Sequence, residues 1–324
     1  MIKIITDKRD YIRNADVTKF PIVFDNMIKA NVFGKDITMY NNKWMHHLHL
    51  KITDKCMCKC DFCIEKGKAG PEDELKYLEY TEKVMKEIYS NDILYSVSLT
   101  GGEPLIFNRL TDLLGILKKY NTPFVTMNTN GVLLNDNKLS VIDGNIDFID
   151  ISRHSIGDDE NSKLFGCNRV PTTREIYNIK HNLSKTKVRL QYVITNKMKL
   201  EDVTNFIDKF YFVDDFSFRR LMNPSSELHN VKYNSYISES SYSSIMNEVY
   251  DKLEFVEQTI QDYYVYETWR YKDKNITFSY SNMDMLITQE TDESNNFYRE
   301  FILHPDCTFS GSWNKSSKLF CVSK

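Results

Sequence analysis

Residues 51–63 read KITDKCMCKCDFC and contain Cys56, Cys60 and Cys63 in a Cys-x3-Cys-x2-Cys arrangement. The motif follows residues 48–52, where apolar and polar side chains alternate as in a strand. Cysteine thiolates this close together are the ligands that iron–sulfur clusters require. A four-iron, four-sulfur cluster normally takes four cysteines, so three would leave one iron with an open position. An open position is typical of a catalytic metal site rather than a structural one.

The composition is that of a globular protein. The 324 residues are 41% apolar and 27% charged, which is enough to bury a sizeable core. The net charge is -3 without a sustained Lys/Arg block, so we expect no nucleic-acid partner. No apolar run reaches the roughly 18 residues of a membrane span, and the first residues are too charged for a secretory signal. Four of the seven cysteines crowd into residues 56–63, unlike a disulfide framework. We therefore expect a cytoplasmic protein.

Strand and helix patterns alternate along the first two thirds of the chain. The expected strands are His46–Thr53, Ile93–Thr100, Phe124–Asn130, Ile146–Ser152, Lys187–Thr195 and Phe216–Leu221. The expected helices are Pro71–Ser90, Arg109–Tyr120, Asp136–Ile142, Thr173–Leu183, Leu200–Phe210 and, later, Ser238–Val256. Six strand–helix units predict an α/β fold, with a parallel sheet covered by helices.

Polar and glycine residues gather where the predicted strands end. These clusters are TGGEP at 100–104, NTNG at 128–131, SRH at 152–154 and RR at 219–220. In parallel barrels the active site lies at the carboxyl ends of the strands. Four clusters at four strand ends therefore predict one active site more strongly than any single motif.

The cysteine motif and the Gly-Gly-Glu-Pro sequence together resemble the radical S-adenosylmethionine (SAM) superfamily, over roughly residues 44–223. The nearest branch contains peptide-modifying enzymes and the molybdenum-cofactor cyclase. The resemblance implies an α/β fold: a partial (βα)6 TIM-like barrel at 45–223, a short N-terminal cap or edge segment at 1–44, and a C-terminal α+β extension at 224–324. The extension is expected to close the barrel and shape the substrate site.

The resemblance also implies an oxygen-sensitive radical enzyme. Its 4Fe-4S cluster would reductively cleave SAM to a 5′-deoxyadenosyl radical, which abstracts hydrogen from the substrate. An electron donor such as flavodoxin or ferredoxin would be a partner. Cys56, Cys60 and Cys63 would bind three irons, and the methionine moiety of SAM would chelate the fourth.

The remaining cofactor contacts follow from the same resemblance. Glycines 101 and 102 would let the backbone approach SAM closely. Glu103 would accept a charge-assisted hydrogen bond from the amino group of SAM. The other expected SAM-binding residues are Phe62, Pro104, Thr129, Ser152, Asn196 and Arg219. The anion at Arg219 could belong to SAM or to the substrate, and only one of Arg219 and Arg220 should point inward.

Arg153 and His154 are the candidate catalytic residues, because they lie where the substrate is expected. A histidine can transfer a proton near neutral pH. The alternative is a structural ion pair or hydrogen bond, and the sequence favours neither the catalytic nor the structural role.

Two other interpretations of the cysteines are weighed. A non-catalytic iron–sulfur or zinc protein could use Cys58 as a fourth ligand, but the second motif favours radical SAM chemistry with Cys58 as a spectator. The scattered Cys167, Cys307 and Cys321 are too few for another cluster with ordinary ligation. We therefore predict one cluster.

Family analogy favours a ribosomally made peptide as the substrate. No leader-binding domain is evident in the first 44 residues, so a peptide would need a separate leader-peptide-binding protein or the C-terminal region. The alternative substrate is a small molecule, such as a nucleotide, an amino sugar or an amino-acid derivative.

Overall fold

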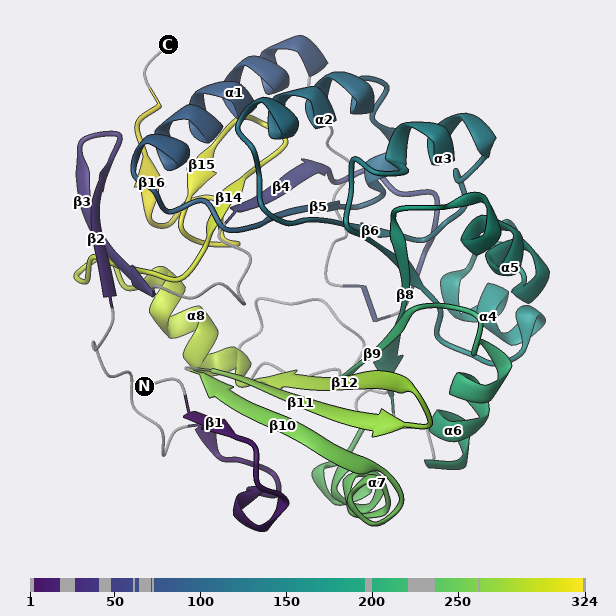
Figure 1. The fold of residues 1–324 in the computed structure, drawn as a ribbon. Helices are drawn as coiled ribbons and strands as arrows, with labels where there is room; N and C mark the ends of the chain where they lie inside the picture. Colours follow the sequence, from purple (N-terminus) through teal and green to yellow (C-terminus); the bar gives the residue numbers. More distant parts are fainter. Residues whose placement is uncertain are drawn as a thin grey trace.

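Parallel strands curve around a common interior in the computed structural model (Figure 1). The described residues are 3–17, 27–40, 48–60, 62, 63, 71, 73–195, 200–220, 237–261 and 263–322. The six strands expected from the alternation pair in chain order. They are β4 (Leu48–Thr53), β5 (Val97–Gly101), β6 (Val125–Thr129), β7 (Phe148–Ser152), β8 (Lys187–Ile194) and β9 (Asp215–Arg220). The expected partial barrel is confirmed.

Two strands from the C-terminal region extend this parallel run. β12 (Lys274–Ser281) pairs with β9, and β14 (Phe301–Leu303) pairs with β4. Within the described residues β12 and β14 do not pair with each other, so the ring of strands stays open. The helix α8 (Met283–Thr291) follows β12 and lies on this open side (Figure 1).

Helices cover the outside of the parallel strands (Figure 1). They are α1 (Glu74–Ser90), α2 (Leu110–Lys119), α3 (Asp136–Ile142), α4 (Asp158–Phe165), α5 (Thr173–Asn182) and α6 (Leu200–Lys209). Some of these helices start with polar caps: Asp73 accepts from the Leu75 N–H, and Thr172 and Glu175 form a capping box. The sequence patterns did not predict α4.

The strands present apolar side chains to the helices and polar ones to the interior. In β4, Leu48 and Leu50 are fully buried, whereas His49 is partly exposed. Polar residues of three different strands meet inside the ring. Gln191 of β8 donates to Asn128 of β6 at 3.0 Å, and Asn128 donates to Ser98 of β5 at 3.2 Å. The bond from β8 to β6 passes over β7, which places these side chains on the concave face. The interior is therefore polar, unlike the branched apolar filling common in closed barrels.

Both ends of the chain add strands to this core. β1 (Lys3–Ile5) pairs with β10 (Glu254–Gln261), which continues through β11 (Tyr264–Tyr271) to β12. A second sheet joins β2 (Met27–Val32), β3 (Lys35–Tyr40) and β13 (Phe297–Tyr298). The remaining elements are the 3-10 turns η1 (Lys8–Asp10) and η3 (Pro104–Ile106), the helix α7 (Glu239–Lys252), and the strands β15 (Phe309–Ser310) and β16 (Leu319–Phe320).

The helix expected to reach Val256 instead ends at Lys252, because the chain turns into β10 at Glu254. Residues 221–236 lie outside the described residues, so the expected boundary at 223/224 remains a proposal. Among the described residues, no helix is both long and apolar enough to cross a membrane.

Candidate functional site

The cysteine loop leaves the carboxyl end of β4 and is held by backbone hydrogen bonds. The N–H groups of Gly102 and Glu103 donate to the carbonyls of Thr53 and Lys55 at 2.5 and 2.9 Å. On its other side, the Lys59 N–H donates to the carbonyl of Phe165 at 2.8 Å. The loop is therefore fixed between the end of β5 and the end of α4.

The cysteine thiols lie partly exposed on this loop. The thiol of Cys58 donates to Cys56, and the Asn130 amide lies 3.5 Å from the Cys56 sulfur. These donors lower the pKa of Cys56 to about 6, so it is a thiolate at neutral pH. Burial, chiefly, raises the pKa of Cys60 to about 12. Binding a metal would require each ligand thiol in its deprotonated form.

The thiols are not arranged for a single metal ion. Among the described residues, no three Cys, His, Asp or Glu side chains are close enough to hold one ion. A cubane binds each cysteine through a different iron, so its ligands stand further apart. The assignment of Cys56, Cys60 and Cys63 as cluster ligands remains a proposal.

Glycines 101 and 102 pack closely against the backbone of the cysteine loop. A Cβ on Gly101 would lie 2.2 Å from the Thr53 carbonyl oxygen, and one on Gly102 would lie 2.3 Å from that of Lys55. Gly101 also has φ +133°, which side chains disfavour. The missing side chains make room for the cysteine loop, and a contact of these two glycines with SAM remains a proposal.

Glu103 is fully buried beside this loop and accepts three hydrogen bonds. Its Oε1 accepts from the Thr129 hydroxyl at 2.7 Å and the Leu105 N–H at 3.1 Å, and its Oε2 accepts from the Asn130 N–H at 2.8 Å. Burial raises its pKa to about 7 despite these bonds. A carboxylate has about four acceptor positions, so one remains. A cationic amine would fit there and stabilise the charged form.

Asn130 is a site residue that the sequence analysis did not single out. Its N–H bonds Glu103, and its side-chain amide lies 3.5 Å from the Cys56 sulfur and 3.3 Å from the Met57 sulfur. It therefore connects the carboxylate with the cysteine loop. Its place in the NTNG cluster at a strand end was the available indication.

The other expected SAM-binding residues fall into two groups. Thr129 is buried and already bonded to Glu103, and Pro104 is buried at the start of η3. Phe62 and Ser152 are partly exposed near the same rim. Asn196 lies outside the described residues. The contact of each with SAM remains a proposal.

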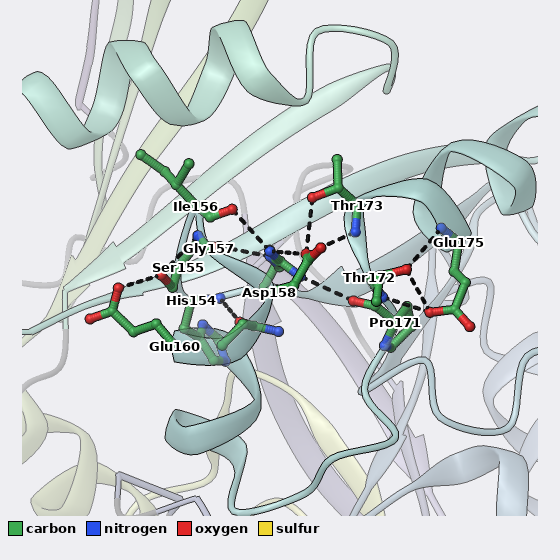
Figure 2. A network of polar contacts seen from close by, with 12 residues as sticks. His154, Ser155, Ile156, Gly157, Asp158, Glu160, Pro171, Thr172, Thr173 and Glu175 are labelled. Atoms are coloured by element: carbon green, nitrogen blue, oxygen red, sulfur yellow. Dashed lines mark hydrogen bonds and ion pairs between the residues drawn. The ribbon is translucent and has the colours of Figure 1, made fainter.

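Arg153 lies on the helix side of β7, where it is fully buried. Its guanidinium bonds Asp158 at 2.7 Å and also donates to three main-chain carbonyls, those of Ser155, Ile156 and Pro171. The Asp158 carboxylate accepts from Thr173 at the start of α5 as well (Figure 2). Burial alone would raise the pKa of Asp158, but these bonds hold it below its ordinary value. The structural alternative for Arg153 is thus favoured, and it joins α4 to α5.

His154 is packed between aromatic rings and has one fixed hydrogen bond. Its Nδ1 accepts from the Val193 N–H at 3.1 Å, so the proton of the neutral ring is on Nε2. Its ring centroid lies 4.8 Å from that of Phe62 and 4.9 Å from that of Phe165. Burial, and then the neighbouring guanidinium, lowers its pKa to about 3. His154 is therefore better suited to donate a fixed hydrogen bond than to exchange a proton near neutral pH.

Arg219 and Arg220 point to opposite faces of β9. Arg220 lies over the ring of Tyr242 on α7, at 4.7 Å. Arg219 is exposed, and its strand neighbours are Val193 of β8 and Ser279 of β12. The expectation that only one of the two arginines points inward agrees with this geometry.

An open parallel barrel with three loop cysteines and a buried carboxylate at its carboxyl rim defines a class of cofactor-dependent enzymes. The model of the radical SAM superfamily matches residues 50–219, just over half of the chain. The chain therefore belongs to the radical SAM superfamily. It is a radical SAM enzyme, whose cofactors are a 4Fe-4S cluster and S-adenosylmethionine.

Curated relatives match about half of this chain. A GTP 3′,8-cyclase of Clostridium perfringens (strain SM101 / Type A) is 28% identical over 170 residues, which are 51% of each chain. A probable GTP 3′,8-cyclase of Thermoplasma volcanium is 23% identical over 182 residues, 56% of this chain and 53% of that one. The chain thus spans about half the length of the curated relatives it matches.

A solved structure matches more of the chain. Streptococcus suis SuiB superposes with a TM-score of 0.58 at 15% identity, over 82% of this chain and 60% of that chain. At this identity the likeness concerns the fold.

Proposed function

We propose that this enzyme applies radical SAM chemistry to a small polar molecule bound in the barrel interior. The observation that carries the proposal is the polar concave face, where the Gln191–Asn128–Ser98 chain runs from β8 to β5 and Arg219 is exposed on the neighbouring strand β9. Buried or enclosed polar groups need polar partners, which a polar substrate would provide. The cyclases that match the barrel carry the name of a small-molecule substrate, which supports this choice.

The bound cofactors would supply the chemistry: an electron from the cluster cleaves SAM, and the resulting 5′-deoxyadenosyl radical abstracts hydrogen from the substrate. The protein's own residues would position the reactants. Cys56, Cys60 and Cys63 are the proposed cluster ligands, and Glu103 is the proposed acceptor for the amino group of SAM. Asn130 would hold the Glu103 carboxylate and the cysteine loop in a fixed relative position, because it contacts both.

A ribosomally made peptide is the second candidate substrate. The likeness to SuiB extends beyond the barrel, and one matching SuiB structure is described as bound to a precursor peptide. A peptide would have to reach the interior through the C-terminal region or with a separate leader-peptide-binding protein. An electron donor such as flavodoxin or ferredoxin is proposed for either substrate.

Anaerobic reconstitution tests the class of chemistry. We expect about four irons per chain and 5′-deoxyadenosine formed from SAM after reduction with dithionite. Cys60→Ala should lose the iron and the 5′-deoxyadenosine together. The matched control, Cys58→Ala, should lose neither. Loss of iron in Cys58→Ala, or an intact cluster that leaves SAM uncleaved, would contradict the proposal.

The substrate class is tested with the same assay. A cell extract is separated by size, and each fraction is tested for stimulation of 5′-deoxyadenosine formation. We expect the small-molecule fraction to stimulate. Stimulation by the peptide fraction alone would replace the small molecule with the second candidate.

A further inference from the structure

Two arginines converge on one tyrosine on the wall of the interior formed by β9, β11 and β12. Arg219, Ser279 and Tyr266 lie in one row across these strands. Tyr264 comes two residues before Tyr266 on β11 and so lies on the same face of the sheet. The Tyr264 hydroxyl accepts a hydrogen bond from Arg219. The guanidinium of Arg299 lies over the ring of Tyr264, at 4.3 Å from its centroid. Tyr264 thus holds a cation at its hydroxyl and another at its ring face.

The Glu300 carboxylate acts on both guanidinium groups and is also bonded to two other residues. Glu300 precedes β14, and its Oε2 pairs with His49 of β4 at 2.9 Å. Its Oε1 accepts from the indole N–H of Trp313 at 2.8 Å. Two guanidinium groups therefore face one carboxylate that has two other partners. Among the described residues, the guanidinium groups of this wall outnumber the carboxylate that acts on them, and a bound anion would lower the electrostatic energy.

Arg299 and Glu300 also line a pocket, together with Tyr263 and Lys318. The Lys318 ammonium bonds the Asn295 side-chain oxygen at 3.0 Å and the Phe297 carbonyl at 2.6 Å, which are uncharged acceptors. The charged groups around the pocket are thus mostly cationic. Arginine forks recognise phosphate and carboxylate groups in a bidentate way.

The anion could belong to SAM or to the substrate, and the sheet order separates the two. Glu103 follows β5, whereas Arg219 is on β9, four strands further along the parallel run. β5 lies on the side of the ring opposite β9 and β12 (Figure 1). The amino and carboxylate groups of SAM are attached to the same carbon atom. If Glu103 takes the amino group, a guanidinium on the opposite wall cannot take the carboxylate.

We propose that Arg219 and Arg299, assembled around Tyr264, bind a phosphate or carboxylate group of the substrate. This inference rests on the proposed function, because it places the anionic end of a small molecule across the barrel from SAM. It revises the expectation that Arg219 binds the cofactor. It also gives the substrate a chemical class: a small molecule with an anionic group at some distance from the reacting C–H bond.

Chemical modification of the reconstituted protein tests the proposal without the substrate. Phenylglyoxal adducts on arginine are mapped by mass spectrometry with no addition, with inorganic pyrophosphate, or with SAM. We expect pyrophosphate to protect Arg219 and SAM not to. Arg220 is the internal control, since it lies on the other face of β9 and its modification should not change. Protection by SAM, or no protection by pyrophosphate, would overturn the proposal.

A variant gives a second measurement. Arg219→Gln should weaken pyrophosphate binding by at least about tenfold in equilibrium dialysis, because a charge-assisted contact is lost. Arg219→Lys should recover part of this affinity, and Arg220→Gln should match the wild type. Unchanged pyrophosphate affinity in Arg219→Gln would contradict the anion site. These measurements need no turnover, so they fail independently of 5′-deoxyadenosine formation.

Discussion

The two walls of the barrel interior hold their polar groups in different ways. On the β5–β6 side, Glu103 is fully buried and two of its three hydrogen bonds come from backbone N–H groups. On the β9–β11 side, Arg219 and Arg299 are held by the hydroxyl and the ring of Tyr264. Backbone donors fix a position more firmly than side-chain contacts. If Glu103 binds SAM and the two arginines bind the substrate, as proposed, the cofactor meets a preorganised wall and the substrate a more adaptable one.

Replacing Glu103 should give the largest effect on this comparison. Glu103→Gln removes the charge-assisted contact with an ammonium group, so SAM affinity should fall roughly ten- to a hundredfold. Equilibrium dialysis of labelled SAM against the reconstituted protein measures this affinity. On the opposite wall, Arg219→Gln should change SAM affinity much less. Equal losses in the two variants would show that the walls do not divide cofactor from substrate.

A smaller effect is expected where the cysteine loop packs against β5. In Gly102→Ala the new Cβ would meet the Lys55 carbonyl at 2.3 Å, so the loop must shift. Overpacking of this kind costs about 1–3 kcal/mol, and the iron content after reconstitution should fall. Gly115→Ala in α2 is the control, because nothing lies within 4 Å of its added Cβ. The two variants are compared by thermal unfolding and iron counting, and equal results would argue against the packing role.

The change with the least bearing on this comparison concerns the outer face of the β9–β11 wall. Glu267 of β11 is buried and accepts bonds from Tyr11, Trp269 and Gln258, yet burial raises its pKa to about 7. The folded state then binds a proton more tightly than the unfolded state. Stability from this group is complete below the ordinary pKa of about 4.5 and is lost as pH rises through 7.

Urea unfolding at several pH values measures this contribution. As the pH rises from about 4.5 to about 7, the fall in the free energy of unfolding of the wild type should be of the order of 3 kcal/mol. It should be smaller for Glu267→Gln, which does not titrate. Glu257→Gln on β10 is the control and should keep the wild-type pH dependence. A parallel decline in the wild type and Glu267→Gln would contradict the assignment.

The sequence predicted the six central strands because their apolar periodicity is local. It did not predict that β12 and β14 join them. β14 has only three residues, and its partner β4 is distant in the chain, so periodicity carries no information about the pairing.

The direction of Arg153 could have been predicted. Alternation along β7 places it on the same face as the buried Ile149 and Ile151, which is the helix side. The same reasoning separates Arg219 from Arg220, because Phe216 and Phe218 are buried. By contrast, the pairing of Arg219 and Arg299 at Tyr264 depends on antiparallel register, which the sequence pattern does not specify.

The pairing of Leu48 with Phe301 has a consequence for biosynthesis. β4 is made well before the strand that covers its other edge, because β14 follows it far along the chain. Until then an apolar strand edge remains open to pairing with other chains. Contacts between such distant segments also slow folding, because a long loop must close first. The nascent chain should therefore depend on protection of β4 until β14 emerges from the ribosome, which makes this edge the expected starting point of aggregation during expression.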